Sequence, residues 1–358
     1  MDQNFWDNKK IIITGHTGFK GAWLSLLLSK LGAKICGISL KPEKESLFNQ
    51  LSLENIIEEH NIADINDLTA FKDIADKFKP DFVFHLAAQP IVRQSYTLPI
   101  LTWETNLIGS LKVLEALKNV RKKCVVIIVT TDKVYDNQKS IFGYRENDPL
   151  GGSDPYSASK AALEIAINSW KKSFCGNYSH QSSHLSIATV RSGNVLGGGD
   201  WALDRIMPDA IRAIRSQKPI IVRNPNSTRP WQHVLEPLSG YLELAKFLYL
   251  NSVLDHKFDS FNFGPTIYSN KSVEDLVLEI FKNWNGKLIY ENNKADNFHE
   301  EKLLHLQIDK AYKILGWKPK WDFSTTIKRT VDWYKKTHLE IISPEKACNQ
   351  DIEDYITN

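Results

Sequence analysis

The sequence carries little net charge and has no long apolar run, and each shortage excludes a class of protein. Its 45 lysines and arginines are nearly balanced by 42 aspartates and glutamates, which leaves a formal charge of +3. That charge is too small and too evenly spread for the basic face of a nucleic-acid binder. The longest apolar runs, such as Val125 to Val129, are far shorter than the roughly 20 residues that cross a membrane. We therefore expect neither a nucleic-acid nor a membrane partner.

Cysteine is also scarce. The four cysteines lie far apart, with no C-x-x-C pair and no histidine at metal-ligand spacing, so we expect reduced thiols and no metal site. The N-terminal residues MDQNFWDNKK lack the apolar core of a signal peptide. Together these absences predict a cytoplasmic protein. The cysteines are Cys36, Cys124, Cys175 and Cys348.

The first half of the chain alternates short β-branched runs with helical patterns, as a doubly wound parallel sheet requires. Because the runs are almost continuously hydrophobic, helices must cover both faces of the sheet. The expected strands are Lys10–Thr14, Lys34–Leu40, Asp81–Leu86, Val125–Thr131 and Leu185–Arg191, and the expected helices are Gly21–Leu31, Asp67–Lys79, Thr105–Lys118 and Ala158–Phe174.

The first strand-to-helix turn is rich in glycine. Gly15, Gly18 and Gly21 have the spacing G-x-x-G-x-x-G between a β-branched strand and a helix. Residues without a Cβ let the backbone approach a pyrophosphate, whose charge the helix N-terminus stabilises. The alternative is a glycine-rich turn that only joins the strand to the helix and binds nothing. The position of the glycines at the first βα turn favours a dinucleotide site.

The choice between NAD and NADP is not decided by this turn. The second strand should end near an Asp or Glu that binds the adenosine ribose, but Lys41 occupies about that position. Asp64 and Ile65, after the presumed third strand, are candidates for the adenine edge, and an ordinary acidic loop residue is the alternative for Asp64.

The composition of the sequence changes after Arg191, where frequent glycines and prolines indicate a loop-rich region. We predict an α/β fold, a Rossmann-like doubly wound parallel sheet with a smaller, loop-rich C-terminal substrate domain over the sheet's carboxyl edge. Residues 1–190 plus about 236–264 would form the dinucleotide domain, residues 191–235 and about 265–340 the substrate domain, and 341–358 a tail without a clear pattern. Helical patterns return at Leu238–Leu250, Val273–Trp284, Asp309–Leu315 and Ser324–Tyr334.

Two polar clusters predict an active site. Tyr156 and Lys160 lie four residues apart at the start of a helix, so both side chains rise from one face. A neighbouring ammonium, together with a positively charged nicotinamide, would lower the pKa of the tyrosine from its usual value near ~10. Upstream, a buried strand runs into Thr131, Asp132 and Lys133. Burial of unpaired polar groups is costly, and a strand-end cap would explain Thr131 alone.

These three features together resemble the extended short-chain dehydrogenase/reductase family of sugar-nucleotide enzymes. The matching region runs from about Phe5 to Trp333 and is most similar to the 4,6-dehydratases of that family. Most of those dehydratases carry Asp-Glu after the strand-end threonine, so Asp132-Lys133 points to the branch that acts on CDP-glucose. The matching stretches are Thr14–Trp23, His85–Pro90, Thr131–Asn137, Gly143–Lys160, Gly193–Asp204 and Arg223–Tyr241.

The resemblance implies a lyase of deoxysugar biosynthesis that uses NAD, acts on CDP-glucose and forms a homodimer or tetramer. Tyr156, activated by Lys160, would take the proton of the sugar 4-hydroxyl, to which Thr131 would hydrogen-bond. Lys133 would remove the C5 proton and Asp132 would protonate the departing 6-hydroxyl. The implied cofactor-binding residues are Gly15, Thr17, Gly18, Phe19, Gly21, Asp64, Ile65, Leu86, Ala87, Ala88, Asn106, Tyr156 and Lys160.

Residues for the sugar nucleotide are expected in the irregular region, because arginine forks suit a pyrophosphate. A surface arginine is the alternative at each position. The candidates are Asn194, Arg223, Arg229 and His233, with Gln89 and Arg93 as weaker ones, whereas His16 and His85 are expected to be structural.

Two other functions share part of this pattern. An epimerase that oxidises and re-reduces C4 would need the glycine loop and the Tyr–Lys pair, but not an acid and a base after Thr131. A redox-silent dinucleotide sensor would keep the fold but usually loses the Tyr–Lys pair. Asp132-Lys133 and Tyr156-Lys160 therefore favour the dehydratase.

Overall fold

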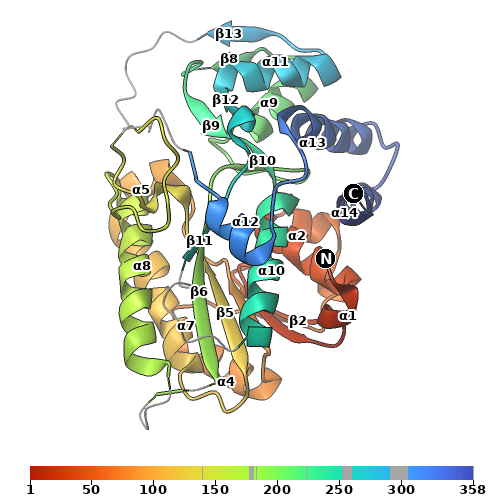
Figure 1. Cartoon of the computed structure of the whole chain (residues 1–358). Coiled ribbons are helices and arrows are strands. Elements are labelled where there is room, and N and C mark those ends of the chain that lie inside the picture. Colours follow the sequence, from red (N-terminus) through yellow and green to blue (C-terminus); the bar gives the residue numbers. More distant parts are fainter. Residues whose placement is uncertain are drawn as a thin grey trace.

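A seven-stranded parallel sheet forms the centre of the molecule, with the order β11-β6-β5-β4-β1-β2-β3 (Figure 1). The computed structural model describes residues 1–138, 140–176, 181–182, 184–222, 224–251, 260–290 and 305–357, so the predicted substrate residue Arg223 lies outside the described residues. The α/β fold with a doubly wound parallel sheet is confirmed. The strands are β1 (Lys10–Thr14), β2 (Lys34–Ser39), β3 (Glu59–Ile62), β4 (Phe82–His85), β5 (Cys124–Val129), β6 (Leu185–Ser192) and β11 (Ser260–Phe263).

Different helices cover the two faces of the sheet (Figure 1). Successive side chains of a strand point to opposite faces, so Ile11 and Ile13 of β1 join one core and Ile12 joins the other. The first core includes α2 (Phe19–Lys30) and α10 (Leu235–Asn251). The second core includes α4 (Leu68–Phe78), α7 (Ser110–Leu117) and α8 (Pro155–Phe174).

Helix α8 begins before the predicted Ala158 because its first turn is capped. Asp154 Oδ1 accepts a hydrogen bond from the Ser157 backbone N–H, and Pro155 occupies the first helical position. The predicted helix 105–118 is divided, since a π-helix, η2 (Glu104–Gly109), precedes α7. The short elements of this half are α1 (Gln3–Trp6), α3 (Leu47–Gln50), η1 (Leu53–Asn55), α5 (Val92–Thr97), α6 (Pro99–Trp103) and η3 (Asp132–Val134).

Several elements that follow β6 lie beyond one end of the sheet, at the top of Figure 1. Three small two-stranded sheets form here: β7 (Val195–Leu196) pairs with β10 (Gln232–His233), β8 (Ile220–Val222) with β13 (Leu288–Tyr290), and β9 (Thr228–Pro230) with β12 (Asn270–Ser272). The accompanying helices are α9 (Ile206–Arg215), η5 (Ile267–Ser269), α11 (Val273–Asn283) and α13 (Phe323–His338). Helix α12 (Asp309–Leu315) instead packs against β11 and α10 of the sheet region.

The tail forms a helix that the sequence pattern does not indicate, α14 (Pro344–Thr357). Its buried face includes the polar residues Asp351 and Tyr355. Tyr355 donates a hydrogen bond of 2.7 Å to Glu236 Oε2, and Arg329 lies 3.3 Å from Asp351 Oδ1. The hydrophobic pattern does not predict this helix, because polar side chains make part of its contact with the rest of the protein. The partners of these side chains lie far away in the sequence.

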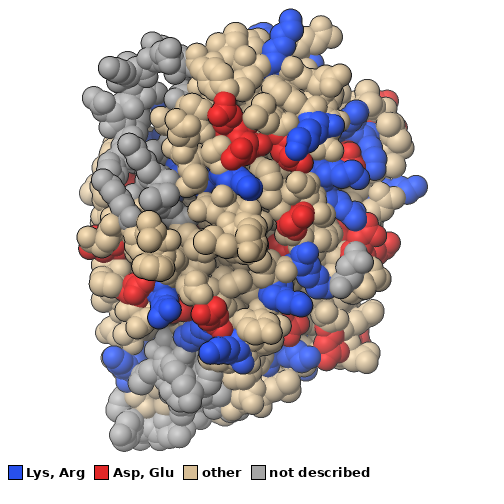
Figure 2. Space-filling view, turned by 45° about the horizontal axis from the view of Figure 1, so that its top comes forward, with Lys and Arg blue, Asp and Glu red and all other residues tan. Residues whose placement is uncertain are grey.

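The surface is mixed in charge. Lys and Arg side chains alternate with Asp and Glu over the face shown in Figure 2, in keeping with the near balance of 45 basic and 42 acidic residues. All four cysteines are free, and Cys36, Cys124 and Cys348 are buried. None of the helices within the described ranges has both the length and the apolar character that a membrane crossing requires.

Candidate active site

The candidate site lies at the carboxyl edge of the sheet. Parallel strands end on the same side, so the segments that follow β1, β4, β5 and β6 meet there. These segments are the glycine loop (15–21), residues 86–89, the strand-end triplet Thr131, Asp132 and Lys133, and residues 192–194.

The glycine loop leaves no room for side chains. Gly15 has φ +73°, and a Cβ there would lie 2.8 Å from the Ala87 backbone nitrogen. A Cβ on Gly21 would lie 2.1 Å from the Gly15 carbonyl oxygen. Gly18 is the N-cap residue of α2, whose first residue is Phe19. A bare backbone cradle before a twelve-residue helix fits the pyrophosphate of a dinucleotide.

Residues 86–88 are tied to this cradle. The backbone N–H groups of Leu86 and Ala87 donate to Thr14 Oγ1, at 3.1 and 3.2 Å. Ala88 follows them at the same edge and is half-buried. The turn after β4 is therefore held against the end of β1.

The side of the cradle next to the end of β2, where the ribose is predicted to bind, has hydroxyl groups rather than a carboxylate. Thr17 Oγ1 and Ser39 Oγ lie 2.7 Å apart, and Thr17 Oγ1 donates to the Leu40 carbonyl oxygen at 3.2 Å. Lys41 follows and is exposed. Asp64 is exposed and accepts from the Asn66 N–H, whereas Ile65 is buried.

Asn106 and Gln89 serve the scaffold. Asn106 Oδ1 accepts from the Gln89 N–H at 2.8 Å, and Asn106 Nδ2 donates to Ser159 Oγ at 3.0 Å. The Gln89 amide donates to Thr102 Oγ1. These bonds connect the turn after β4 to α8, directly beside Lys160, and they occupy side chains that the sequence assigned to ligands.

Tyr156 and Lys160 are both buried at the site. Burial raises the pKa of Tyr156 to about 12, although a hydrogen bond with Thr131 acts to lower it. Among the protein's own groups, desolvation thus outweighs the neighbouring charges. The predicted lowering of this pKa also includes the effect of a positively charged nicotinamide, and it stays a prediction. Lys160 Nζ donates to the Val129 carbonyl oxygen at 3.1 Å, and burial lowers its pKa to about 8, with Glu164 acting in the opposite direction.

Asp132 has the properties of a general acid. It is 2% exposed, and burial raises its pKa against the lowering effect of Lys133. Its Oδ1 accepts from Thr131 Oγ1 at 3.0 Å, whereas no described residue gives Oδ2 a hydrogen bond. A buried carboxyl group with one unoccupied oxygen can hold a proton for transfer to a ligand. Lys133, half-buried in η3, donates its backbone N–H to Thr131 Oγ1.

Gly193 provides the space in which the Asp132 carboxyl group lies. A Cβ on Gly193 would lie 2.6 Å from Asp132 Oδ2 and 2.9 Å from Pro230 Cγ. Gly193 follows β6, so the end of that strand shapes the position of the acid.

The structure adds a group of residues that the sequence analysis missed. Lys20 Nζ donates to Ser192 Oγ at 3.2 Å and to Tyr241 OH at 3.4 Å. Burial lowers the pKa of Lys20 to about 7, helped by the positive charges of Arg205 and Lys160. Lys20 lies between Gly18 and Gly21. The motif specifies only the glycines, so their spacing gives no signal for this lysine.

The predicted substrate residues fall into two groups. Arg229 is buried and lies near enough to Asp132 to lower its pKa, and Asn194 is exposed beside Gly193. Arg93 instead pairs with Asp204 at 2.9 Å. His233 is 0% exposed, with ring contacts to Trp23 and Trp321, and burial lowers its pKa to about 3. The structure therefore places His233 in the core.

His85 and His16 take part in internal hydrogen bonds. His85 Nδ1 lies 2.7 Å from Thr14 Oγ1, and its Nε2 lies 2.8 Å from Ser110 Oγ. His16 Nε2 lies 2.7 Å from His60 Nδ1. Both rings are thus held beneath the site.

Comparison with known proteins gives consistent matches along most of the chain. The family model described as GDP-mannose 4,6 dehydratase matches residues 12–330. A CDP-glucose 4,6-dehydratase of Salmonella typhimurium is 43% identical over 337 residues, which cover 94% of this chain and 93% of that protein. A dTDP-glucose 4,6-dehydratase of Shigella flexneri is 27% identical and covers 91% of this chain and 92% of its own length.

Solved structures share the fold. A dTDP-glucose 4,6-dehydratase of Bacillus anthracis in complex with NAD has a TM-score of 0.74 and 20% identity, over 92% of this chain and 98% of that chain. A UDP-glucose 4-epimerase of Thermotoga maritima with UDP-glucose has a TM-score of 0.76 and 21% identity, over 92% of this chain and 99% of that chain. These likenesses confirm the Rossmann-like architecture.

Proposed function

Because the chain belongs to the GDP-mannose 4,6 dehydratase family, we propose that it converts CDP-glucose to CDP-4-keto-6-deoxyglucose with bound NAD, in deoxysugar biosynthesis. The 43% identity to the Salmonella typhimurium enzyme supports CDP-glucose as the substrate. The observation that carries dehydration is the buried Asp132, which has a raised pKa and a free Oδ2 beside Thr131 and Tyr156.

The glycine loop would hold the cofactor pyrophosphate, and Thr17, Asp64 and Ile65 would lie along its adenosine. When bound, NAD supplies the acceptor for the C4 hydride and its donor to C6, and the oxidised ring's positive charge favours the Tyr156 phenolate that burial disfavours. Tyr156 takes the proton of the 4-hydroxyl group, whose oxygen would receive the hydrogen bond that Thr131 otherwise donates to Asp132. Lys160, fixed on the Val129 carbonyl, keeps a positive charge behind the tyrosine.

Elimination uses the other two residues of the strand-end triplet. The 4-ketone acidifies the C5–H bond, and the Lys133 amine takes that proton while a C5–C6 double bond forms. Asp132 gives its proton to the 6-hydroxyl oxygen, the C6–O bond breaks, and water leaves. Lys133, now protonated, would return a proton to C5. The NAD held by the glycine loop would supply the hydride for C6, so no second redox substrate would be consumed.

The nucleotide part of the substrate would meet the C-terminal elements. Arg229 offers a guanidinium beside the reacting groups, and Asn194 offers an exposed amide at the end of β6. Arg223, six residues before Arg229 in the sequence, is proposed as a second pyrophosphate ligand on sequence grounds alone. A guanidinium group can donate two parallel hydrogen bonds to the oxygens of a phosphate, which suits the diphosphate of CDP-glucose.

The direct test is incubation of the purified protein with CDP-glucose, dTDP-glucose, UDP-glucose and GDP-mannose, without added reductant. We expect a 4-keto-6-deoxy product from CDP-glucose, identified by its mass loss of one water. A C4 epimer with unchanged mass would instead identify an epimerase, and faster conversion of another nucleotide sugar would reassign the substrate.

The space at Gly193 gives a prediction about the acid. Gly193→Ala places a Cβ 2.6 Å from Asp132 Oδ2, so the carboxyl group must move. We expect kcat to fall about tenfold to a hundredfold, because small misplacements of a reacting group are costly, while the substrate dissociation constant changes little. Gly264→Ala is the control, since its nearest contact, Leu306 Cβ at 3.3 Å, belongs to a side chain. Equal turnover by the two variants would mean that Asp132 is not the acid.

A second prediction concerns the cofactor. Hydroxyl groups and Lys41, rather than a carboxylate, surround the ribose end of the cradle. We expect NADH to bind more tightly than NADPH, but by less than about a hundredfold, or about 2.7 kcal/mol, because no negative charge repels the 2′-phosphate. Titration of both dinucleotides measures this ratio, and Lys41→Glu should widen it. A hundredfold or larger preference in the parent would contradict the prediction.

A further inference from the structure

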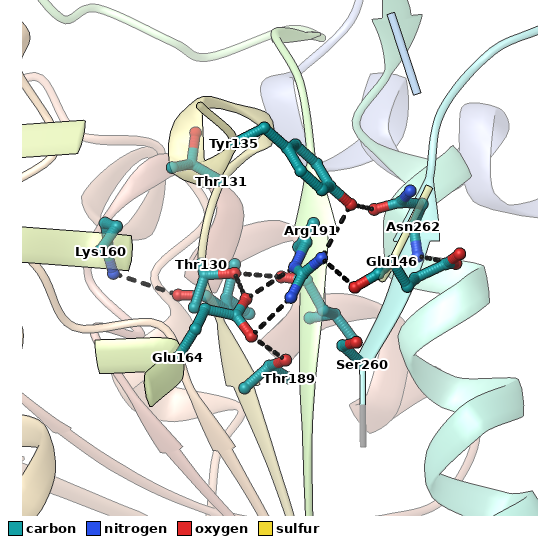
Figure 3. Close-up of polar contacts among 12 residues, drawn as sticks. Thr130, Thr131, Tyr135, Glu146, Lys160, Glu164, Thr189, Arg191, Ser260 and Asn262 are labelled. Carbon is teal, nitrogen blue, oxygen red and sulfur yellow. Dashed lines mark hydrogen bonds and ion pairs between the residues drawn. The ribbon is translucent and has the colours of Figure 1, made fainter. Parts of the chain in front are cut away.

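A buried ion pair lies beneath the catalytic residues. Glu164 is one helical turn after Lys160 on α8, and its carboxylate receives Arg191 Nε at 2.9 Å and Nη2 at 3.1 Å (Figure 3). The Glu164 and Arg191 side chains are 4% and 3% exposed. Such a pair often contributes little to stability compared with apolar residues, because both charges must be desolvated. Stability alone is therefore a weak explanation for this buried ion pair, and a role in positioning other residues is considered next.

Two threonines complete the coordination of the carboxylate. Thr130 Oγ1 donates to Glu164 Oε1 at 2.6 Å, and Thr189 Oγ1 donates to Oε2 at 2.6 Å. Thr130 Oγ1 also lies 3.2 Å from the Val190 carbonyl oxygen. A hydroxyl has one hydrogen, and the shorter contact with a charged acceptor takes it.

Thr130 connects this pair to the active site. The peptide that joins Val129 to Thr130 contains the carbonyl group that receives Lys160 Nζ. The next residue is Thr131, the first of the strand-end triplet. By holding the Thr130 side chain, Glu164 therefore fixes both the acceptor of Lys160 and the point where the triplet begins.

The same guanidinium fixes the other end of the triplet. Arg191 Nη1 donates to Tyr135 OH at 2.8 Å and to the Glu146 carbonyl oxygen at 3.0 Å. Tyr135 OH in turn donates to Asn262 Oδ1 of β11 at 2.7 Å (Figure 3). Tyr135 follows Val134, directly after the triplet and its 3-10 turn. The catalytic segment is thus anchored before and after its reacting side chains.

We propose that the Glu164–Arg191 pair is the positioning device of this active site, holding Thr130 and Tyr135 so that the strand-end triplet stays in register with Tyr156 and Lys160. The proposal rests on the proposed dehydratase chemistry for its kinetic test. Removing either charged partner would leave the other buried and unpaired, which destabilises the whole fold. The two threonines give a cleaner comparison, since each donates to one oxygen of the same carboxylate.

The experiment compares Thr130→Val with Thr189→Val. Both remove a 2.6 Å hydrogen bond to Glu164 and keep the side-chain shape, and both sites are buried. We expect similar losses in Tm, but only Thr130→Val should lower kcat, by about tenfold to a hundredfold with little change in KM. The reason is that Thr130 directly precedes the strand-end triplet, whereas Thr189 lies inside β6. Thr130→Ser restores the hydroxyl and should recover most of the lost kcat.

Equal kcat values for the two valine variants, or no recovery with serine, would overturn the proposal. If Thr130→Val does not fold, Tyr135→Phe removes the second anchor while keeping the ring, and the same fall in kcat is expected. Crystal structures separate this result from the dehydratase assignment. Displacement of residues 131–133 in Thr130→Val but not in Thr189→Val supports positioning whatever the substrate proves to be, and an undisturbed segment contradicts it.

Discussion

Tyr156→Phe should reduce the kcat of CDP-glucose dehydration by about 10²–10⁴, the usual effect of removing a general base. The substitution removes the phenolic oxygen and keeps the ring. The sugar nucleotide should therefore bind with nearly its parental dissociation constant, while the first hydride transfer slows. The raised pKa of Tyr156, about 12 because of burial, makes this residue dependent on the positive charge of the bound cofactor.

Single-turnover absorbance of reduced cofactor measures the affected step, and calorimetric titration measures substrate binding. Tyr144→Phe is a matched control, because Tyr144 is also buried and its hydroxyl bonds to Asn137 and to the Gln138 N–H rather than to a residue of the triplet. The substitution keeps the ring that stacks on Tyr135. Turnover of Tyr156→Phe within tenfold of the parent would remove Tyr156 from the role of base.

Lys133→Met should uncouple oxidation from elimination. Tyr156, Lys160 and Thr131 remain, so C4 oxidation should proceed and reduced cofactor should accumulate. Without an amine at position 133 the C5 proton stays in place, and we expect product formation to fall by about 10²–10⁴. In heavy water the parent should place solvent deuterium at C5 of the product and the original C4 hydrogen at C6.

Asp132→Asn is the informative companion to Lys133→Met. It keeps the base and removes the acid, so C5 exchange with solvent should continue while loss of the 6-hydroxyl slows. Near-normal product formation and normal C5 exchange by Lys133→Met would assign the base elsewhere. Tyr135 would be a poor substitute, since its hydroxyl bonds to Arg191 and Asn262 and burial raises its pKa, so a bound water would become the next candidate.

The sequence predicts the scaffold well because the scaffold depends on local patterns. Strand β1 occupies the predicted residues 10–14, and helix α12 occupies the predicted residues 309–315. Both have apolar residues at the spacing of their own element. Helix α14 was missed because its buried face includes Asp351 and Tyr355, whose contribution is visible only once Arg329 and Glu236 are brought beside them.

The candidate site was predicted in position more than in orientation. A residue that follows a parallel strand is expected at the carboxyl edge of the sheet, where ligands bind. This rule alone correctly locates Asp132 and Gly15. It does not show whether a side chain turns toward the ligand or into the protein. Gln89 donates to Thr102 and the His233 ring contacts Trp321, and neither orientation can be read from the sequence. Desolvation is likewise invisible in a sequence, and it raises the pKa of Tyr156, in opposition to the lowering predicted from the ammonium and the nicotinamide.

The contact between α14 and α10 also bears on the order in which the chain is synthesised. Glu236 leaves the ribosome 119 residues before Tyr355, the hydroxyl that donates to it. The Lys320 and Trp321 backbone N–H groups, its other donors, emerge 84 and 85 residues after it. During synthesis, the Glu236 carboxylate therefore has none of these hydrogen-bond donors until residues 320 and 321 have been made. Strand β11 emerges within the same interval, so the seventh strand can join the sheet before the carboxylate on the neighbouring helix has found its final donor.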